Sequence, residues 1–439
     1  MRKLISAFLV VPLVLIGLVL RDKIAHDRSV GPSAILIITA LGSLSLLSLM
    51  SLLLYRTRFR SSVANAWLAV GATIVAYAVC DLATGYFLIK PSAPRILDQY
   101  VHHKLQPNTF ARFKTTDYDY VQRVNNLGLR GPDVDPIKKA SSYRILMLGD
   151  SFTMGLGVED DETFSARLEK SLRAQSLTAH GRTIHVLNAG VSSYAPILSL
   201  FQLTRGVGKL DPDLVILNLD MGDLEQDTGY RSLARFDPMG GIVGVDGRED
   251  AAGVPTLSTR VRVWIDRHLY VTRLLVLYLD EVTGATDLAE PTVENTVNVM
   301  TKTVLRHTLA EDSVVDRTRE WRNIFDSILR IRDYCARHGF TFVMTLYPWG
   351  HQVNDKEWVP GRRQFVPPGA AISDRSIVRL HQFCRENSIE VLDVFPAFRA
   401  YRGATLLYHK HDMHWTPQGH RLMAQQLEQY LVRTHVVTP

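Results

Sequence analysis

The sequence contains little cysteine, and this scarcity excludes two kinds of architecture. Only three of the 439 residues are cysteines, and the spacing of Cys80, Cys335 and Cys384 matches no pattern of metal ligands. Three cysteines also cannot supply the several bridges of a disulfide-rich scaffold. One bridge between Cys335 and Cys384 stays open as an alternative, but we expect both to be small buried residues on helices.

A concentrated basic surface is missing as well. The formal net charge is +6 and the pI is about 9.1, yet Lys and Arg are scattered, and no basic stripe with interleaved aromatic residues occurs. We therefore predict no nucleic-acid partner. The chain also lacks internal repeats and low-complexity segments, and its 46% hydrophobic and 21% charged residues are typical of a globular protein.

Long apolar runs are present, but only in residues 1–90. The runs 4–20, 33–55 and 63–89 each approach the roughly 17 to 25 residues that a membrane-spanning helix needs. No small-x-small cleavage site follows the first run, which disfavours the alternative of a cleaved signal peptide. The sequence thus predicts three transmembrane helices, and so an integral membrane protein.

The basic residues near these runs predict an orientation. Positive charges gather before the first run and between the second and third, at Arg2, Lys3, Arg56, Arg58 and Arg60. The positive-inside rule places both sites in the cytoplasm. Three crossings then put the C-terminal domain on the extracytoplasmic side of the membrane. Asp81 lies inside the third run, where an acid either marks a conduit or faces a neighbouring helix.

The rest of the chain divides into a tether and a domain. Residues 91–140 are rich in proline and show little periodicity, which favours a tether. In residues 141–436 short apolar runs alternate with helical patterns, and this alternation predicts an α/β domain with a parallel sheet. The expected strands are 144–148, 183–187, 214–219, 341–346 and 389–394, and the expected helices are 163–176, 196–207, 320–338, 374–387 and 417–434.

An insertion at about residues 225–319 interrupts this alternation. Its first half carries Gly240-Gly241 and Asp246-Gly247, which suggest a hairpin. Residues 261–282 show a helical pattern with a broad apolar face. Such a helix either lies on a membrane or packs on the sheet, and burial against the sheet is the more common use of an apolar face.

The sharpest chemical signal is Gly149-Asp150-Ser151, which directly follows the apolar run 144–148. The run predicts a buried parallel strand, which would deliver Ser151 to the carboxyl edge of the sheet. Open α/β folds bind their ligands at that edge. By itself, however, a serine after a strand is more often a helix cap than a nucleophile.

A second polar cluster, Asp412-x-His414, precedes the last expected helix. An acid two residues before a histidine can fold back onto the same imidazole, orient it and stabilise its cation, while the other ring nitrogen takes a proton from a serine. Any one of the 15 histidines can be structural. The joint positions of the two motifs nevertheless favour a triad of Ser151, His414 and Asp412.

Together these motifs resemble those of the SGNH/GDSL hydrolases, over about residues 143–432. Gly149-Asp150-Ser151 is similar to the family's first block, whose serine is the nucleophile. Asn188-Ala189-Gly190 is similar to the second block, whose glycine donates a backbone N–H to the oxyanion, and Asp412-x-His414 to the last, which supplies the base and its orienting acid. The resemblance implies a three-layer α/β/α domain that acts on esters without a cofactor or a metal.

The third block departs from the family pattern. Where the family commonly has an Asn-Asp pair, this chain has Gly222-Asp223, so a side-chain donor is missing from the oxyanion hole. The resemblance then implies an oxyanion held by the N–H groups of Ser151 and Gly190, with space at Gly222 for a donor from the insertion or for a substrate group. Asp220 and Asp223 remain, but a carboxylate cannot replace a donor unless it is protonated.

Two further stretches resemble parts of known families. Asn125, Gly128 and Arg130 resemble a pattern that precedes the first block in many bacterial SGNH hydrolases. The run His414-Trp415-Thr416 is similar to one in periplasmic polysaccharide O-acetyltransferases, such as those that act on alginate. This likeness favours a glycan substrate, and it implies a bacterial inner (plasma) membrane with the catalytic domain on the extracytoplasmic, periplasmic side.

The candidate substrate-binding residues follow the strand ends and the motif blocks: Asn188, Asp223, Trp349, His351 and Trp415. For the aromatic residues, loop packing is the alternative role. We expect a membrane-anchored serine esterase that removes or transfers O-acyl groups, acetyl foremost, on envelope or exported glycans. The alternative is a catalytically weak or inactive SGNH-fold module that binds glycans or assists their assembly.

Overall fold

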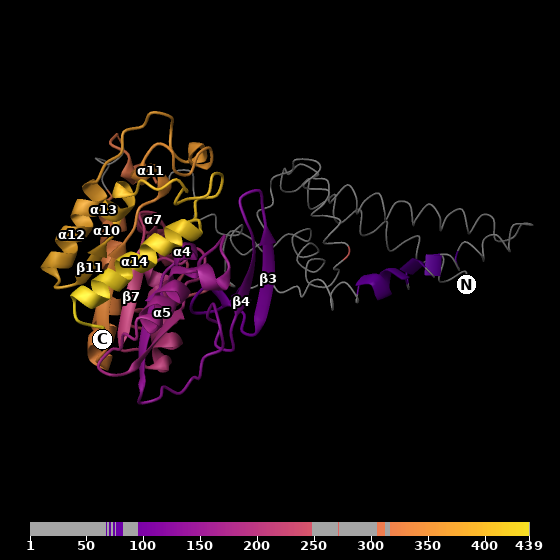
Figure 1. Cartoon of the computed structure of the whole chain (residues 1–439), viewed down its shortest axis with the longest axis horizontal. Coiled ribbons are helices and arrows are strands. Elements are labelled where there is room, and N and C mark those ends of the chain that lie inside the picture. The colour runs from indigo at the N-terminus through magenta and orange to yellow at the C-terminus, as the bar shows by residue number, and fades with distance from the viewer. Residues whose placement is uncertain are drawn as a thin grey trace, which may run out of the picture. The chain divides into compact units, whose positions relative to one another are not determined.

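The computed structural model describes residues 95–247, 305–311 and 317–438, together with some positions within 67–81 and Val271. The chain forms two compact units (Figure 1). One comprises residues 1–93 and 252–296, and the other residues 94–251 and 297–439. The second unit contains every motif of the predicted catalytic site.

The described part of the first unit contradicts the predicted transmembrane region. No helix among the described residues is long and apolar enough to cross a membrane. The runs 4–20 and 33–55 lie outside the described residues, and the third run is described only at some positions within 67–81. Asp81 is buried, and its Oδ1 accepts the backbone N–H of Val271 at 2.8 Å, so it faces a neighbouring segment.

A five-stranded parallel sheet organises the second unit. Its order is β11-β10-β7-β5-β6. The strands are β5 (Ser142–Leu148), β6 (Thr183–Asn188), β7 (Leu214–Leu219), β10 (Thr341–Leu346) and β11 (Glu390–Asp393). The chain reverses its direction of growth between β5 and β7, and such a switch point opens a ligand crevice at the carboxyl ends of the strands.

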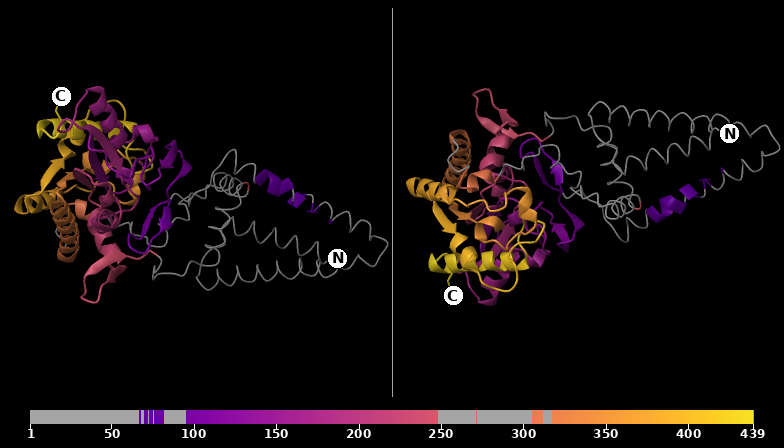
Figure 2. Two further views of the ribbon diagram at one scale, coloured as in Figure 1. Left: turned by 90° about the horizontal axis from the view of Figure 1, so that it is seen from below. Right: turned by 90° about the horizontal axis from the view of Figure 1, so that it is seen from above.

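Helices cover both faces of the sheet (Figures 1 and 2). They are α5 (Phe164–Ala174) and α14 (Pro417–Arg433) on one face, and α6 (Pro196–Arg205), α7 (Asp223–Arg231), α10 (Thr318–His338) and α12 (Arg375–Glu386) on the other. Short helices are α4 (Ser151–Met154), α11 (Gly350–Val353) and α13 (Phe395–Ala400).

The buried strand β5 shows why three layers form. Its residues Leu146 and Leu148 share a core with α6, α7, α10 and α12, whereas Ile145 and Met147 share a core with α5 and α14. Successive side chains of a strand point to opposite faces, so an uninterrupted apolar strand needs a helical cover on each side. The predicted three-layer α/β/α arrangement with a parallel sheet is confirmed.

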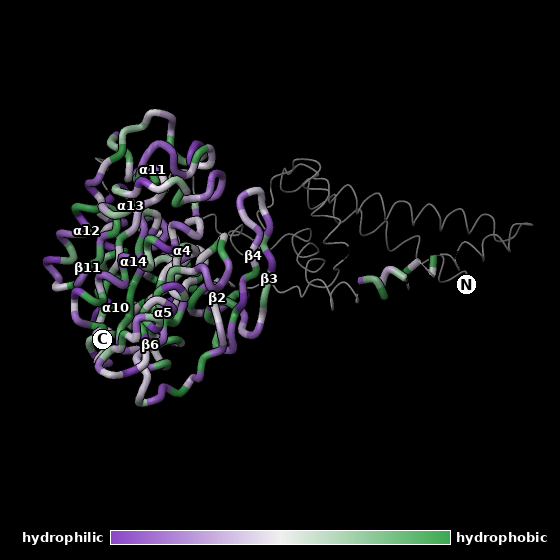
Figure 3. The backbone as a smooth tube through the Cα atoms, viewed as in Figure 1, coloured by the Kyte–Doolittle hydropathy of each residue, from purple (hydrophilic) through white to green (hydrophobic). Residues whose placement is uncertain are grey.

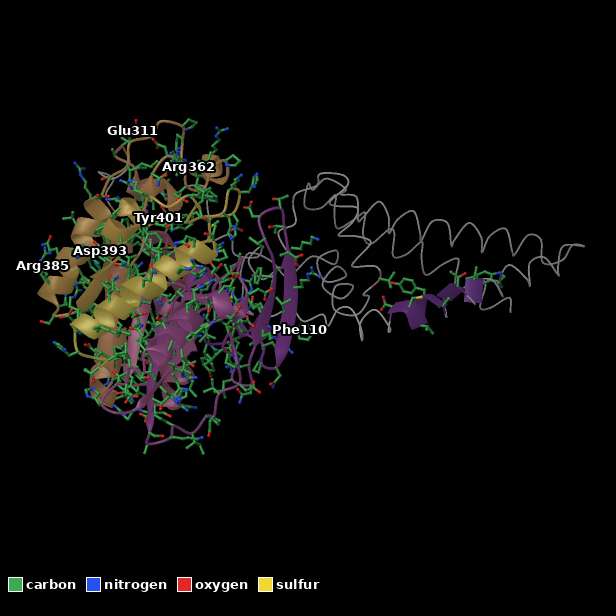
Figure 4. The ribbon with its side chains drawn as sticks, viewed as in Figure 1. Phe110, Glu311, Arg362, Arg385, Asp393 and Tyr401 are labelled. Carbon is green, nitrogen blue, oxygen red and sulfur yellow. The ribbon has the colours of Figure 1, made fainter. Side chains whose placement is uncertain are left out.

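Residues 95–140, for which the sequence predicted a tether, form two antiparallel pairs within the second unit. These are β1 (Arg95–Leu97) with β2 (His103–Leu105) and β3 (Thr109–Lys114) with β4 (Asp119–Val124). The β3–β4 hairpin is largely hydrophilic in Figure 3, and Phe110, which Figure 4 labels on β3, is 39% exposed. The prolines lie between or beyond these strands, where no ladder hydrogen bond is lost.

Part of the predicted insertion is described. The expected hairpin is β8 (Ala234–Phe236) paired with β9 (Ile242–Val245), and 3₁₀ helix η4 covers Arg306–Thr308. Apart from Val271, the expected helix 261–282 lies outside the described residues. Cys335 on α10 and Cys384 on α12 are free and buried, as expected.

Candidate active site

A tight turn after β5 presents Ser151. A Cβ on Gly149 would lie 2.3 Å from Thr153 Oγ1 and 3.0 Å from the Asn218 carbonyl oxygen, so only glycine fits between β5 and α4. Asp150 caps α4, because its Oδ1 accepts the N–H of Phe152 at 2.9 Å and that of Thr153 at 3.4 Å. Ser151 is therefore the first residue of α4, at the carboxyl edge of the sheet.

His414 lies against this serine although 263 positions separate the two residues in sequence. Its Nε2 is 2.6 Å from Ser151 Oγ, and its ring centroid is 4.8 Å from that of Phe152. The loop that carries His414 is held by a bridge between Tyr408 and Trp415, with the His409 N–H donating to the His414 carbonyl at 3.0 Å. The geometry is that of a nucleophile and its general base.

Asp412 binds the other side of the same imidazole. Its Oδ1 is hydrogen-bonded to His414 Nδ1 and also accepts the backbone N–H of His414 at 2.9 Å. Burial raises the pKa of Asp412, but the charge and hydrogen bonds of His414 outweigh it and lower the pKa to about 2. Asp412 is thus a carboxylate at neutral pH, which assigns the proton of neutral His414 to Nδ1 and leaves Nε2 free to accept.

The predicted oxyanion donors differ in how they are engaged. The Ser151 N–H lies in the first turn of α4, where no intrahelical acceptor exists. The Gly190 N–H donates to Asn188 Oδ1 at 3.0 Å, and the Gly222 N–H donates to Asp220 Oδ1. Only the Ser151 N–H is therefore uncommitted among these three in the structure.

Asn188 and Gly190 hold β6 close to the nucleophile turn. Asn188 Nδ2 donates to the Thr153 carbonyl at 2.9 Å, and a Cβ on Gly190 would lie 2.2 Å from the Met154 nitrogen. Glycine is required because the backbones of the two motifs touch. The second motif block thus contacts the first through its backbone.

Gly222 caps α7 and is enclosed by side chains. A Cβ there would lie 3.0 Å from Asp220 Oδ1, 3.4 Å from Trp349 Cζ2 and 3.7 Å from Gln226 Nε2. Gln226 was not singled out from the sequence, because its position on α7 became visible only in the fold. The space that the absent asparagine would have used is already lined on three sides.

Three buried acids lie beneath the site. Burial raises the pKa of Asp220 and of Asp223 well above the usual range, and the charge of Asp150 adds to the effect on both. Burial also raises the pKa of Asp150, which His414 and the Tyr347 hydroxyl, donating at 2.9 Å, oppose. Like charges in a dry region favour shared protons over separate carboxylates.

The predicted substrate-binding side chains are buried. Trp349 and Trp415 are 1% and 0% exposed and pack around Phe152, while His351 Nε2 is 2.8 Å from Thr308 Oγ1. Burial lowers the pKa of His351 to about 3. Asn188 and Asp223 are buried too. In this structure the two tryptophans pack against Phe152 in the turn that carries Ser151.

Two groups of residues at the site were missed or only partly anticipated. Arg130 donates to the carbonyls of Met154, Gly155 and Val158 and pairs with Asp160 at 2.9 Å, so it holds the loop after the nucleophile. The sequence signal for Arg130 was the resemblance of residues 125–130 to a pattern that precedes the first motif block in many bacterial SGNH hydrolases.

Asp117 and Tyr118, in the turn between β3 and β4, contact the loop of Asp412. No sequence signal marked them, because the stretch was interpreted as a tether. Among the described residues, no group of three His, Cys, Asp or Glu side chains is placed to hold a metal ion.

Comparison with known families agrees with the geometry. The model of a family described as SGNH hydrolase-like domain, acetyltransferase AlgX, matches residues 310–438, which include Asp412 and His414. Residues 310–438 of the chain are thus similar to an SGNH hydrolase-like domain. The match and the site geometry indicate an enzyme that acts on ester bonds, as an acyl-group esterase or an acetyltransferase. Ser151 precedes the matched residues, and the structure brings it to them.

Solved structures similar to this protein are remote in sequence. A lipase/acylhydrolase from Enterococcus faecalis is 14% identical, with a TM-score of 0.35 over 68% of this chain and 98% of its own. A catalytic mutant of an acetylxylan esterase from Geobacillus stearothermophilus is 14% identical, with a TM-score of 0.33 over 66% and 95%. Esterase EstA from Pseudoalteromonas sp. is 10% identical, with a TM-score of 0.32 over 66% and 97%. No curated protein sequence matches the chain.

Proposed function

We propose that this protein removes or transfers O-acyl groups, acetyl foremost, on envelope or exported glycans by a Ser-His-Asp mechanism. The observation that carries the proposal is the contact of Ser151 Oγ with His414 Nε2 at 2.6 Å, with Asp412 on the other ring nitrogen. The three groups are needed in combination only for nucleophilic chemistry.

In the proposed first step Ser151 Oγ attacks the ester carbonyl carbon while its proton moves to His414 Nε2. Asp412 stabilises the resulting imidazolium without taking its proton. Collapse of the tetrahedral intermediate breaks the bond to the leaving alcohol, which receives the proton from Nε2, and an acyl-Ser151 remains. Water or a sugar hydroxyl then attacks this ester, with His414 as base, and regenerates the serine. The acceptor decides between hydrolysis and transfer.

The oxyanion of both intermediates needs donors. The N–H of Ser151 supports this role, since it lies next to the attacking oxygen and has no intrahelical acceptor. The Gly190 N–H already donates to Asn188 Oδ1 at 3.0 Å, so it can bind the oxyanion only through a hydrogen bond shared between the two acceptors. An oxyanion hole with a single uncommitted donor predicts modest turnover.

The proposed acyl group and acceptor rest on the similarity of this chain to other proteins. The matched family model is named for an acetyltransferase, which supports acetyl as the group transferred. The glycan acceptor rests on the likeness of His414-Trp415-Thr416 to polysaccharide O-acetyltransferases. A glycan of the envelope or an exported glycan in turn implies that the catalytic unit works outside the cytoplasm.

The test uses the full-length chain with an aryl acetate and an acetylated polysaccharide, with and without a serine-directed phosphonate. We expect release of acetate or its transfer to added acceptor, labelling of Ser151 by the phosphonate, and loss of both in Ser151→Ala. Equal background rates for the wild type and Ser151→Ala on both substrates would reject the enzyme mechanism and support the binding-module alternative.

A further inference from the structure

The turn of the β3–β4 hairpin contacts the loop that carries Asp412. Asp117 Oδ2 accepts the backbone N–H groups of His411 at 2.8 Å and of Asp412 at 2.7 Å, and Asp117 Oδ1 is 2.9 Å from His411 Nδ1. The Tyr118 hydroxyl donates to Asp412 Oδ2 at 3.0 Å. Four polar contacts therefore join two segments that lie 294 or 295 positions apart in sequence.

The contact with Tyr118 complements the contacts that His414 makes. Both donors from His414 bind Oδ1 of Asp412, and the Tyr118 hydroxyl binds Oδ2. A carboxylate held at one oxygen can rotate about the bond to its own chain, whereas one held at both oxygens has its plane defined. Tyr118 thus supplies the second point that orients Asp412.

The position of Tyr118 is itself defined by packing. Its ring lies 5.2 Å from that of His409 and 5.5 Å from that of Tyr120, and a Cβ on Gly157 would come within 3.1 Å of Tyr118 Cδ1. Gly157 has a φ of +90°, which also favours glycine there. The ring is therefore enclosed by three segments.

The turn is also preorganised. Thr115 Oγ1 accepts the N–H of Asp117 at 3.1 Å and that of Tyr118 at 3.3 Å, and the Thr115 N–H donates to the Tyr118 carbonyl at 2.8 Å. Such local bonds hold the turn in one conformation. Burial and the charge of Asp412 raise the pKa of Tyr118, so the phenol keeps the proton that it donates.

We propose that Tyr118 is a positioning residue of the catalytic site, and that the hairpin turn 115–118 sets the orientation of Asp412 and, through it, of His414. This inference rests on the proposed Ser-His-Asp mechanism. The charged and titratable groups that interact with Asp412 or His414 include Tyr118, Asp117, His409, Asp150 and His420. Removing the Tyr118 donor leaves the carboxylate more strongly attracted to the imidazole proton and less well oriented.

The test compares Tyr118→Phe with Arg112→Gln in the full-length chain. Arg112 forms an exposed ion pair with Asp119 at 2.6 Å in the same hairpin, so its variant controls for hairpin stability. We expect Tyr118→Phe to lower kcat for aryl acetate about tenfold with KM unchanged, because acylation and deacylation use the same base. The acid limb of kcat/KM should move to higher pH. Arg112→Gln should keep the wild-type kcat and pH profile.

A second measurement needs no turnover. In the Ser151→Ala background, NMR of labelled histidines should show His414 taking up its proton at higher pH when Tyr118→Phe is added. Asp117→Asn, which keeps the shape of the turn, should lower kcat in the same direction but less. An unchanged NMR midpoint together with an unchanged kcat would overturn the inference.

These outcomes separate the two proposals. If wild type is active, Ser151→Ala is not, and Tyr118→Phe behaves like Arg112→Gln, then only the role of Tyr118 fails. If Ser151→Ala keeps the wild-type rate, the Ser-His-Asp mechanism itself fails, and the NMR titration still decides whether Tyr118 orients the Asp412–His414 pair.

Discussion

Replacing Gly222 by asparagine restores the residue that related hydrolases carry in the oxyanion hole. From the sequence alone this change could raise or lower turnover, depending on whether the space beside residue 222 is empty. The structure indicates that it is filled. The new Cβ would lie 3.0 Å from Asp220 Oδ1 and 3.4 Å from Trp349 Cζ2, before the amide is added.

Neither the Asp220 carboxylate nor the Trp349 ring can move away easily. Asp220 Oδ1 accepts the N–H groups of both Gly222 and Asp223, and Trp349 is 1% exposed. The backbone at residue 222, with φ of −71° and ψ of −27°, suits any residue, so crowding and not backbone strain is the cost. Overpacking of this kind costs about 1–3 kcal/mol of unfolding free energy.

The effect on catalysis follows from displacement of the Asp220 loop. We expect Gly222→Asn to lower kcat/KM for aryl acetate, by up to about 10²-fold if the shift approaches 1 Å. Gly222→Ala, which adds the same Cβ without an amide, is the matched control and should show most of the loss in stability. Steady-state kinetics and thermal unfolding of the full-length proteins measure both quantities. A rise of tenfold or more in kcat/KM with unchanged stability would refute the filled-space interpretation.

Three further predictions concern the triad, the loop after the nucleophile and acid stability. Asp412→Asn should lower kcat about 10³- to 10⁴-fold because an amide does not stabilise the imidazolium of His414; a loss below tenfold in steady-state kinetics would argue against the triad. Arg130→Lys should lower the unfolding free energy by about 1–3 kcal/mol, since buried carbonyls lose donors; an unchanged urea midpoint would contradict this. Burial lowers the pKa of His351 to about 3, so between pH 6.5 and 3 only the unfolded chain binds this proton and stability falls as the pH falls. The unfolding temperature should fall less steeply with falling pH for His351→Gln than for the wild type. Equal slopes for the two proteins would exclude His351 as a cause of the acid sensitivity.

The sequence by itself predicted the parallel sheet and the place of Gly149-Asp150-Ser151 at the end of a strand. An apolar strand that ends in Gly-Asp-Ser needs helices packed on both of its faces and a tight turn after it. The structure has the buried strand at β5 and the turn before α4. The pair Asp412 and His414 is local, so its mutual contact followed from a spacing of two residues. Such features depend on short stretches of chain, which the sequence states directly.

Other features depended on which distant segments meet. Trp349 and Trp415 follow a strand and a motif block, yet the fold turns them into the core beneath Phe152. The Gly190 N–H is engaged by Asn188, and Gln226 lies beside Gly222 through the start of α7. Apolar or polar character alone does not tell whether a side chain at a strand end points outward or inward.

The hairpin of β3 and β4 was decided entirely by tertiary structure. Prolines and mixed charges made residues 91–140 resemble a tether, because composition records how a segment behaves alone. Only the folded chain brings Asp117 and Tyr118 to Asp412. A hydrogen bond between residues 294 positions apart leaves no periodicity or spacing in the sequence, and this is the physical reason why the contact between Tyr118 and Asp412 required the structure.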